Sequence, residues 1–391
     1  MGHLRFLNAG ESHGPALTAI IEGIPSNLKI SSEFINNELV RRQKGYGRGG
    51  RMKIEKDTAE ILSGVRFGYT LGSPITLMIK NKDWENWTDI MSIEGSPVEK
   101  KQIIEPRPGH ADLVGGIKYG FYDLRNVLER ASARETTTRV AVGAICKQFL
   151  KEFGIEIGSY VLSIGEKSIK DKIEDMPLKE RFEKAESSEI RIPLPELDQE
   201  FKDYIDKAKE DGESLGGIFE VFAIGVPIGL GSYVQWDRKL DGKIAQAFMS
   251  IQAIKCVEIG DGCRLSYLPG SMAHDEIFYD KEKGFYHKTN HAGGIEGGIS
   301  NGEPIIVRAA MKPIPTLMRQ KSLKSVNVIT KEPFMAAKER SDITAVPAAA
   351  VVGEAMLAIV LTDAILEQFG NDNMNNIKKR YQDYIEYIKI Y

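Results

Sequence analysis

The sequence predicts an α/β or α+β fold, because strand-like segments alternate with long helical ones along the chain. Segments 218–227 and 304–310 are apolar, have the length of strands and lead into loops rich in glycine or proline. The longest apolar stretch, residues 345–366, contains the carboxylates Glu354 and Asp363. We therefore predict that this stretch is a buried helix and not a membrane span.

Local signals place further elements in order along the chain. Turn residues at 23–26 end the apolar run 17–21, and segment 74–79 has the composition of a buried strand. Two longer helices are indicated by helical spacing of apolar residues and by a terminal glycine. The signals for helix ends are a cap at Ser31 or Ser32 for a short helix that ends before Gly45, the capping-box pair Ser132 and Glu135 before a helix from about residue 136 to 153, Gly154 after that helix, and Gly370 after the closing helix.

Lysine, glutamate and aspartate dominate residues 166–214, where glycine is scarce. Such a charge pattern is typical of helices with a solvated face. We interpret the segment as a peripheral helical insertion and expect little chemistry from it.

The composition argues against several classes of function. A net charge of -3 over 391 residues disfavours binding to nucleic acid or to a membrane surface. The N-terminus has no basic region followed by an apolar one, so no secretory signal is predicted. The three cysteines form no CxxC pair, which is typical of a reducing, cytosolic compartment. His274, His287 and His291 lack carboxylates in zinc-site order, so no metal is predicted.

A polar trio flanked by glycines lies near the N-terminus, in the segment 10–14, GESHG. His13 has the chemistry to hand a proton to a leaving group near neutral pH. A turn with a hydrogen-bonded structural histidine explains the same residues equally well. This segment alone leaves both interpretations open.

The segment 41–53 contains six cations and four glycines among thirteen residues. Glycine lets the backbone approach a ligand closely, and arginine binds carboxylate and phosphate through paired hydrogen bonds. The segment therefore predicts a clamp for an anionic small molecule. A solvated loop and an RGG-like nucleic-acid arm are the alternatives, and the second is weaker because the segment sits between apolar elements of an acidic chain.

Two further segments combine cations with polar groups at a turn or a helix start. In 107–112, RPGHAD, Arg107 and His110 flank a rigid turn, and Asp112 is close enough in sequence to pair with His110. In 129–136, ERASARET, a serine and the backbone N–H groups of a helix start form an anion site to which two arginines add charge. The alternatives are a surface turn for the first segment and ion pairs along a helix surface for the second.

Three late segments complete the candidate site. Residues 293–302 include five glycines, which suits a backbone pressed against a flat or phosphorylated ligand, but their spacing is not that of a dinucleotide-binding GxGxxG loop. In 312–316, KPIPT, two prolines stiffen the chain, and Lys312 and Thr316 can reach a phosphate. The segment 340–342, RSD, precedes the closing helix.

Together these segments closely resemble the signatures of the chorismate synthase family. Each match is weak by itself, but seven matches in family order are specific. They cover the chain from the N-terminus to the closing helix. The matching segments are 10–15 (GESHGP), 45–52 (GYGRGGRM), 107–112 (RPGHAD), 132–136 (SARET), 297–302 (GGISNG), 312–316 (KPIPT) and 340–342 (RSD).

The resemblance implies a reaction of the shikimate pathway, the route to the aromatic amino acids. 5-Enolpyruvylshikimate 3-phosphate loses its C3 phosphate and a C6 proton in a 1,4-anti elimination that gives chorismate. Reduced FMN is required without net redox change, and in the family's proposed mechanism the flavin lends the substrate an electron and recovers it. The resemblance also implies a monofunctional bacterial type of enzyme, with one domain over residues 1–391, an α+β fold that is a β-α-β sandwich of antiparallel sheets around a helical layer, a homotetramer and a cytoplasmic location.

Residue roles follow from matching positions. His13 is implied as the acid for the departing phosphate, and His110 as the proton source near the reduced flavin. Ser12 and Asp342 match the pair thought to relay a proton from flavin N5. The residues implied to bind FMN are Arg130, Ala131, Ser132, Gln252, Ala253, Gly297, Lys312, Pro313, Ile314, Pro315, Thr316 and Arg340.

The substrate carries two carboxylates and a phosphate, so its binding requires several arginines that converge on one pocket. Burying so many cations is costly without matched anions, and we therefore expect an empty site to be open or mobile. Besides Arg340, the candidates are Arg42, Arg48, Arg51, Arg107 and Arg134, of which Arg42 and Arg48 also match positions assigned to NADPH in family members.

Two other functions stay open from the sequence. A flavin reductase or another FMN oxidoreductase would consume NADPH in proportion to the product formed. A nucleic-acid-binding protein that used residues 41–53 would bind with a steep dependence on salt.

Overall fold

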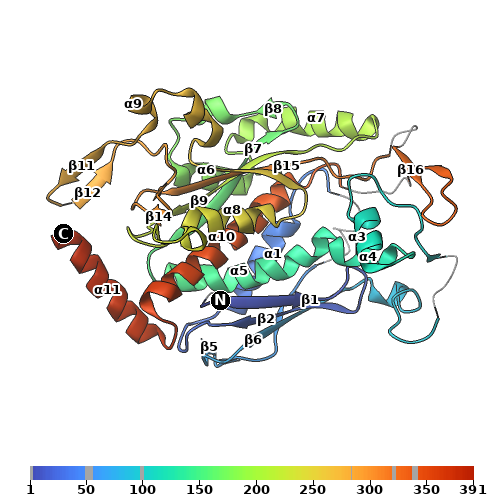
Figure 1. Cartoon of the computed structure of the whole chain (residues 1–391), viewed down its shortest axis with the longest axis horizontal. Coiled ribbons are helices and arrows are strands. Elements are labelled where there is room, and N and C mark those ends of the chain that lie inside the picture. Colours follow the sequence, from blue (N-terminus) through green and yellow to red (C-terminus); the bar gives the residue numbers. More distant parts are fainter. Residues whose placement is uncertain (1–2, 49–55, 97–100, 283, 319–322, 337–341) are drawn as a thin grey trace.

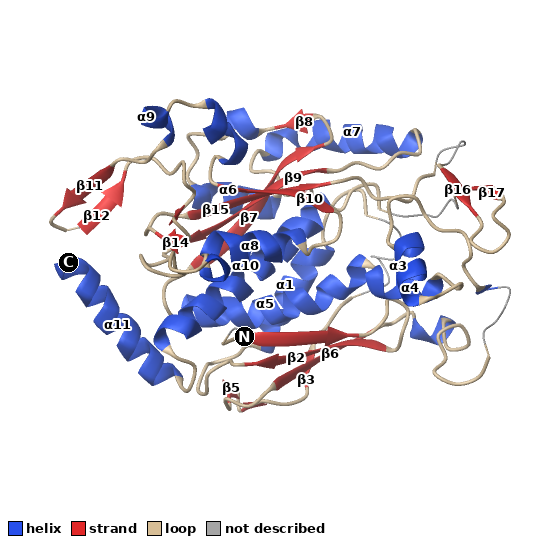
Figure 2. Cartoon of the chain, in the orientation of Figure 1, coloured by secondary structure: helices blue, strands red, loops and turns tan. Residues whose placement is uncertain are grey.

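Two antiparallel sheets enclose a layer of helices in the computed structural model (Figures 1 and 2). The structure describes residues 3–48, 56–96, 101–282, 284–318, 323–336 and 342–391. The β-α-β sandwich expected from the sequence is confirmed. Its central helices are α1 (Ser32–Gln43), α5 (Thr136–Lys151), α8 (Leu240–Met249) and α10 (Val346–Phe369).

The first sheet has the strand order β1-β2-β6-β3, and each neighbouring pair is antiparallel. The second has the order β10-β15-β9-β7-β8, again antiparallel throughout. The strands of the first sheet are β1 (Arg5–Ala9), β2 (Ala16–Glu22), β3 (Glu60–Ile61) and β6 (Ile75–Lys80), and those of the second are β7 (Glu156–Ile164), β8 (Lys167–Ser168), β9 (Gly217–Ile224), β10 (Ile254–Ile259) and β15 (Ile305–Met311).

Smaller elements surround this sandwich. Several of them carry the loops of the candidate site. In chain order they are β4 (Val65–Arg66), β5 (Tyr69–Thr70), η1 (Trp84–Asn86), α3 (Asp112–Tyr119), α4 (Arg125–Ala131), η3 (Ala133–Glu135), η4 (Lys170–Lys172), α6 (Leu178–Ser187), η5 (Pro195–Leu197), α7 (Asp198–Glu210), η6 (Trp236–Arg238), η7 (Gly262–Tyr267), α9 (Gly270–Ala273), β11 (Ile277–Asp280), β12 (Gly284–His287), β13 (Ile295–Glu296), β14 (Ile299–Ser300), β16 (Lys324–Val326), β17 (Pro333–Met335) and α11 (Met374–Ile390).

Local signals explain where the central helices begin. The hydroxyl of Ser31 accepts a hydrogen bond from the backbone N–H of Phe34, which caps α1 as predicted. At α5 the predicted capping box is only partly formed, because Ser132 caps the 3-10 turn η3 by accepting from the N–H of Arg134. The helix α5 itself begins at Thr136, the residue expected.

The closing helix α10 is the core of the molecule. By length and composition it could cross a membrane, but 89% of its most apolar window is buried inside the protein, as expected for a core helix. It lies very close to α5, since a Cβ added to Gly143 would come within 2.4 Å of the Cβ of Ala355. It ends at Gly370 as predicted. The helix that follows it in the chain, α11, was not predicted.

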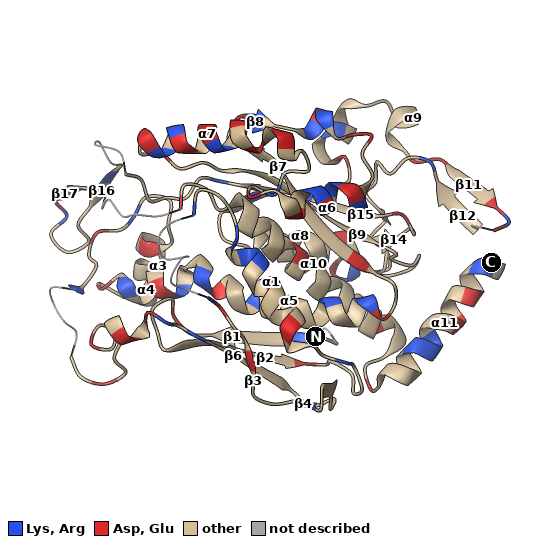
Figure 3. Cartoon of the chain, turned by 180° about the vertical axis from the view of Figure 1, so that it is seen from behind, with Lys and Arg blue, Asp and Glu red and all other residues tan. Residues whose placement is uncertain are grey.

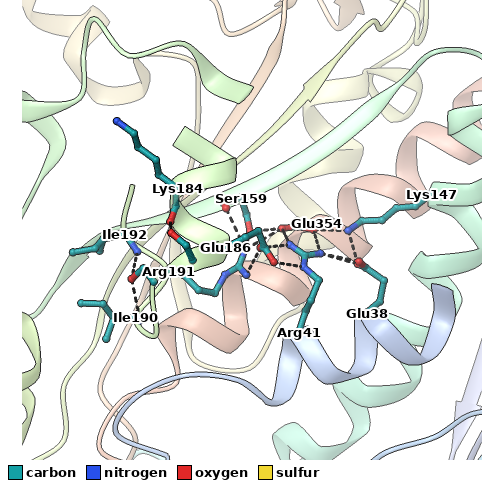
Figure 4. A network of polar contacts seen from close by, with 12 residues as sticks. Glu38, Arg41, Lys147, Ser159, Lys184, Glu186, Ile190, Arg191, Ile192 and Glu354 are labelled. Atoms are coloured by element: carbon teal, nitrogen blue, oxygen red, sulfur yellow. Dashed lines mark hydrogen bonds and ion pairs between the residues drawn. The ribbon is translucent and has the colours of Figure 1, made fainter. Parts of the chain in front are cut away.

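One carboxylate of α10, Glu354, is fully buried and is neutralised by cations from three other segments (Figure 4). It binds Arg41 of α1 at 2.8 Å, Lys147 of α5, and Arg191 at 3.4 Å. Ser159 of β7 also donates to it. This ion network joins α1, α5 and α10 to β7 and to the segment after α6 around a single side chain.

The charged segment 166–214 contains the helices α6 and α7, and α7 presents many charged residues (Figure 3). We expected a peripheral helical insertion with a solvated charged face, and the segment also packs against the rest of the protein. Ile205 is fully buried, and a Cβ on Gly47 would lie 3.0 Å from its side chain. Asp206 accepts a hydrogen bond from the Tyr46 hydroxyl at 2.6 Å. The segment therefore supports the loop that follows α1.

Candidate active site

Three predicted arginines meet at the point where α1 ends and η3 begins. We call Arg42, Arg48 and Arg134 the arginine cluster. Arg42 is buried, and its Nε donates to the Thr136 hydroxyl at 3.0 Å. Arg48, in the loop after α1, pairs with Asp342 at 3.1 Å.

The charges in this cluster influence one another. The pKa of Arg42 is lowered to about 10, first by burial and then by the charges of Arg48 and Arg134, while Asp57 and Asp342 act in the opposite direction. Arg42 therefore remains a cation at neutral pH. The three arginines and two carboxylates form one electrostatic unit with an excess of positive charge.

Arg134 joins this cluster to the N-terminal loop. Its Nη1 binds both carboxylate oxygens of Asp57 at 2.7 Å, and its Nη2 donates to the side-chain oxygen of Asn81 at 2.8 Å. Asn81 in turn donates to the carbonyl of Gly14 at 2.6 Å. The segments 10–14 and 132–136 thus belong to one site.

The site without ligand differs from our expectation of an open one. The side chains of Arg42 and Arg134 are less than a tenth exposed. They are buried because Asp57 and polar groups of the protein replace a bound anion. These partners offset the free-energy cost of burying the two guanidinium groups.

The His13 side chain contacts α4 and is mostly buried. Its Nδ1 lies 2.9 Å from Oε2 of the buried Glu129, and its ring stacks on Trp87 with centroids 3.8 Å apart. The neighbouring Ser12 is buried, and its hydroxyl accepts a hydrogen bond from Ser132 at 3.2 Å. His13 therefore contacts α4, and Ser12 contacts Ser132, the residue that precedes η3 and Arg134.

His110 lines a cleft. Its Nδ1 is 2.5 Å from the buried Asp112, which also binds Nε of Arg107 at 2.9 Å, so the predicted meeting of these three residues is confirmed. Burial would raise the pKa of Asp112, but hydrogen bonds and positive charge from His110 and Arg107 outweigh it and hold that pKa well below its usual range. The cleft beside them has a volume of about 800 Å³ and is lined by residues of α3 and β16.

Four of the residues matched to flavin binding, Arg130, Gln252, Ala253 and Lys312, are linked by hydrogen bonds to segments of these two parts, and we call them the rim. The Gln252 side chain donates to Glu135 at 2.6 Å, while its Oε1 is buried without a hydrogen-bond partner among the described residues. Ala253 has a φ of 67°, in the left-handed region, and its carbonyl accepts from the N–H of Lys312 at 2.9 Å. Lys312 reaches the carbonyl of Gly109 at 2.5 Å, next to His110.

Arg130 closes the other end of this rim. It donates to the carbonyl oxygens of Asn8 and Gly10 at 3.0 and 3.2 Å. Asn8 also donates to Glu135, the carboxylate that holds Gln252. A buried oxygen without a partner among the described residues and a strained backbone beside it fit the binding of a polar ligand.

Comparisons with known proteins give one family. A family model described as chorismate synthase matches residues 4–366. The chain is 77% identical to the chorismate synthase of Sulfurihydrogenibium sp. (strain YO3AOP1), over 97% of this chain and 98% of the relative. It is 64% identical to that of Aquifex aeolicus (strain VF5), over 99% and 98%. A crystal structure of a chorismate synthase superposes with a TM-score of 0.82 at 54% identity, covering 99% of each chain.

The chain belongs to the chorismate synthase family.

Chorismate synthases are lyases that convert 5-enolpyruvylshikimate 3-phosphate to chorismate in the shikimate pathway, and they need reduced flavin. The family assignment confirms the function inferred from the seven segments. Within the described residues, no group of three or more histidine, cysteine, aspartate or glutamate side chains is arranged to hold a metal ion.

The structure brings most matched positions together but not all. Gly297 lies in the β13–β14 hairpin, where the adjacent Gly298 accepts a hydrogen bond from the N–H of Leu240. Leu240 begins α8 and Gln252 follows its end, so the ten-residue helix, about 15 Å long, separates Gly297 from the rim in this chain. Arg51 and Arg340 lie outside the described residues.

Four residues of the site were not found from sequence. Asp57 and Asn81 lie among other charged and polar residues outside the matched segments, and Trp87 lies in a loop without a recognised motif. Glu129 begins a segment that we had selected for its arginines, but nothing linked it to His13.

Proposed function

We propose that this chain carries out the family's 1,4-anti elimination on substrate bound by the arginine cluster, with reduced FMN held on the rim formed by Arg130, Gln252, Ala253 and Lys312. Support comes above all from the convergence of Arg42, Arg48 and Arg134, whose charge two carboxylates balance only in part. Guanidinium groups bind carboxylate and phosphate in paired geometry. A substrate with two carboxylates and a phosphate suits such a site.

The proposed proton donors are His13 and His110. His13 hands a proton to the departing phosphate. Its neighbour Ser12 accepts from Ser132, which caps the turn that carries Arg134, and this connection supports the role. His110 holds a proton at the rim near Lys312, where Asp112 and Arg107 orient it. Ser12 and Asp342 are the proposed relay.

Reduced FMN, when bound, supplies the electron that the elimination needs. The proposed binding residues are those matched in the family: Arg130, Ala131, Ser132, Gln252, Ala253, Gly297, Lys312, Pro313, Ile314, Pro315, Thr316 and Arg340. The unpartnered Oε1 of Gln252 and the strained Ala253 support the central part of this set.

We further propose a single domain, a homotetramer in the cytoplasm, and NADPH as a possible reductant at Arg42 and Arg48. The family assignment supports these proposals. Sedimentation analysis of the purified protein tests the assembly, and a dimer or monomer at micromolar concentration would contradict it.

Anaerobic turnover tests the proposed function directly. Purified protein, the phosphorylated enolpyruvyl substrate and chemically reduced FMN should release one phosphate for each chorismate formed. A parallel reaction with oxidised FMN and NADPH tests whether the chain reduces its own flavin. Absence of phosphate release with reduced FMN would overturn the proposal, and NADPH consumption in proportion to product would favour a flavin oxidoreductase.

A further inference from the structure

Glu129 contacts the loop that carries His13 at three points. Its carboxylate accepts hydrogen bonds from the backbone N–H of His13 at 2.9 Å and lies within 3.0 Å of the His13 ring nitrogen through both oxygens. Its backbone carbonyl accepts from the N–H of Ser12 at 3.0 Å. Two neighbouring residues with proposed proton-transfer roles are thus fixed by one residue of α4.

Glu129 is fixed in its turn. It is almost fully buried, and Arg125, one helical turn earlier, pairs with it at 3.2 Å. Burial would raise the pKa of Glu129, but the hydrogen bonds from His13 and the charges of His13 and Arg125 lower it overall. The side chain is therefore a carboxylate at neutral pH and can only accept hydrogen bonds.

Trp87 completes a rigid frame around the imidazole. Its ring stacks on His13 with an interplanar angle of 25°, and its Nε1 donates to Asp83 at 2.9 Å. The Arg125 guanidinium lies 5.3 Å from the centroid of the Trp87 ring. Stacking fixes the plane of the imidazole, and Glu129 fixes its rotation within that plane.

A carboxylate at Nδ1 determines which nitrogen of the imidazole is available. Because Glu129 accepts and does not donate, the Nδ1 of His13 carries a proton, and in the neutral ring Nε2 is the nitrogen that can accept one. A carboxylate that orients a catalytic histidine in this way acts through the ring and does not touch the reacting atoms.

We propose that Glu129 is a positioning residue that fixes the ring orientation and the Nδ1–H tautomer of His13, so that Nε2 serves the departing phosphate. This inference rests on the proposed role of His13. The same chain offers its own test, because a residue that acts only through His13 has no effect once the imidazole is removed.

The experiment is a double-mutant cycle of Glu129→Leu and His13→Ala, measured by anaerobic phosphate release. Glu129→Leu should lower kcat on the order of 10–100-fold, as the loss of a group that orients a reacting side chain does, with the substrate KM almost unchanged. Glu129→Gln keeps an oxygen for Nδ1–H and should lose less. In the His13→Ala background, Glu129→Leu should cost far less turnover than in the wild type, because only the contact to the backbone N–H of residue 13 remains to be lost. The control is Glu22→Gln, which removes an exposed ion pair with Arg5. This variant should behave as the wild type.

Two results would overturn the inference from kinetics. One is an equal loss of turnover from Glu129→Leu with and without His13, which would indicate a general structural role. The other is full activity of both Glu129→Leu and Glu129→Gln. If Glu129→Leu does not fold, the cycle is run with Glu129→Gln. An equal loss of turnover from Glu129→Gln with and without His13 would then overturn the inference.

A second measurement separates this inference from the proposed role of His13. In protein labelled with ¹⁵N-histidine, the His13 signal, assigned by its loss in His13→Ala, should show the Nδ1–H tautomer when the ring is neutral. Glu129→Leu should shift it toward Nε2–H. An Nε2–H tautomer in the wild type would refute the positioning by Glu129. Full turnover of His13→Ala with an Nδ1–H ring in the wild type would instead refute the role of His13 in the reaction, and with it the part assigned to Nε2.

Discussion

Arg134 binds both oxygens of Asp57 at 2.7 Å, although 77 residues separate the two in the chain. Asp57 is also 4.0 Å from Arg42. One buried carboxylate therefore serves two of the three cations that we expect to hold the substrate. It keeps the site folded before ligand arrives, and it leaves positive charge for the ligand to neutralise.

Replacing Asp57 by Asn should leave Arg134 buried without an opposite charge. We expect a loss of about 3 kcal/mol or more in the free energy of unfolding, because removing one partner of a buried pair leaves the other uncompensated. Saturating substrate should restore part of this stability through its own anionic groups. Urea unfolding with and without substrate measures both effects. Glu60→Gln, which removes an exposed partner of Lys80, is the control and should change stability by less than about 1 kcal/mol.

His110→Ala and Asp342→Ala should each lose turnover while they still bind flavin. The reason is that both side chains are proposed to move protons, whereas the proposed contacts to flavin come from other residues, among them Arg130, Gln252 and Ala253. Flavin fluorescence titration and anaerobic phosphate release measure the two properties separately. Loss of flavin affinity in both variants would show that we assigned their roles wrongly.

The depressed pKa of Asp112 predicts a specific dependence of stability on pH. A carboxyl whose folded pKa lies below its unfolded value of about 4 stabilises the protein above that pH, and the contribution is lost as pH falls toward the folded pKa. The advantage of the wild type over Asp112→Asn in urea unfolding should therefore be complete at pH 6 and smaller at pH 3.5. An advantage that is equal at both pH values would contradict an ionised Asp112 paired with Arg107 and His110.

Glu354→Gln should destabilise the whole helical layer. The change removes the only charge of α10 in the ion network of Figure 4 and leaves Arg41, Lys147 and Arg191 with the remaining carboxylates Glu38 and Glu186. We expect a loss of about 3–5 kcal/mol in the free energy of unfolding. On the same helix, Glu367 forms a half-exposed pair with Lys243, so Glu367→Gln should cost less than about 1 kcal/mol. Similar losses for the two variants would refute a special role for the buried network.

Much of the fold was accessible from local patterns. The cap at Ser31, the helix that begins at Thr136 and the end of α10 at Gly370 were all predicted, because each depends on residues within one or two turns of it. The sandwich itself came from resemblance, and local signals agreed with it without specifying it. The sequence patterns did not predict helix α11 or strand β7, although both are long, regular elements of the structure.

The sequence by itself determined which segments carry chemistry: the loops around His13, Arg48, His110 and Lys312 could be named before any coordinates. Only the tertiary structure decided their partners. Glu129 meets His13 across 116 residues, and Asn81 meets Arg134 across 53. A hydrogen bond or ion pair between distant residues depends on how the sheets and helices pack. One carboxylate in a charged run, such as Asp57, carries no local pattern that reveals its partner. Residue type is a property of the chain, whereas pairing and burial are properties of the packed fold.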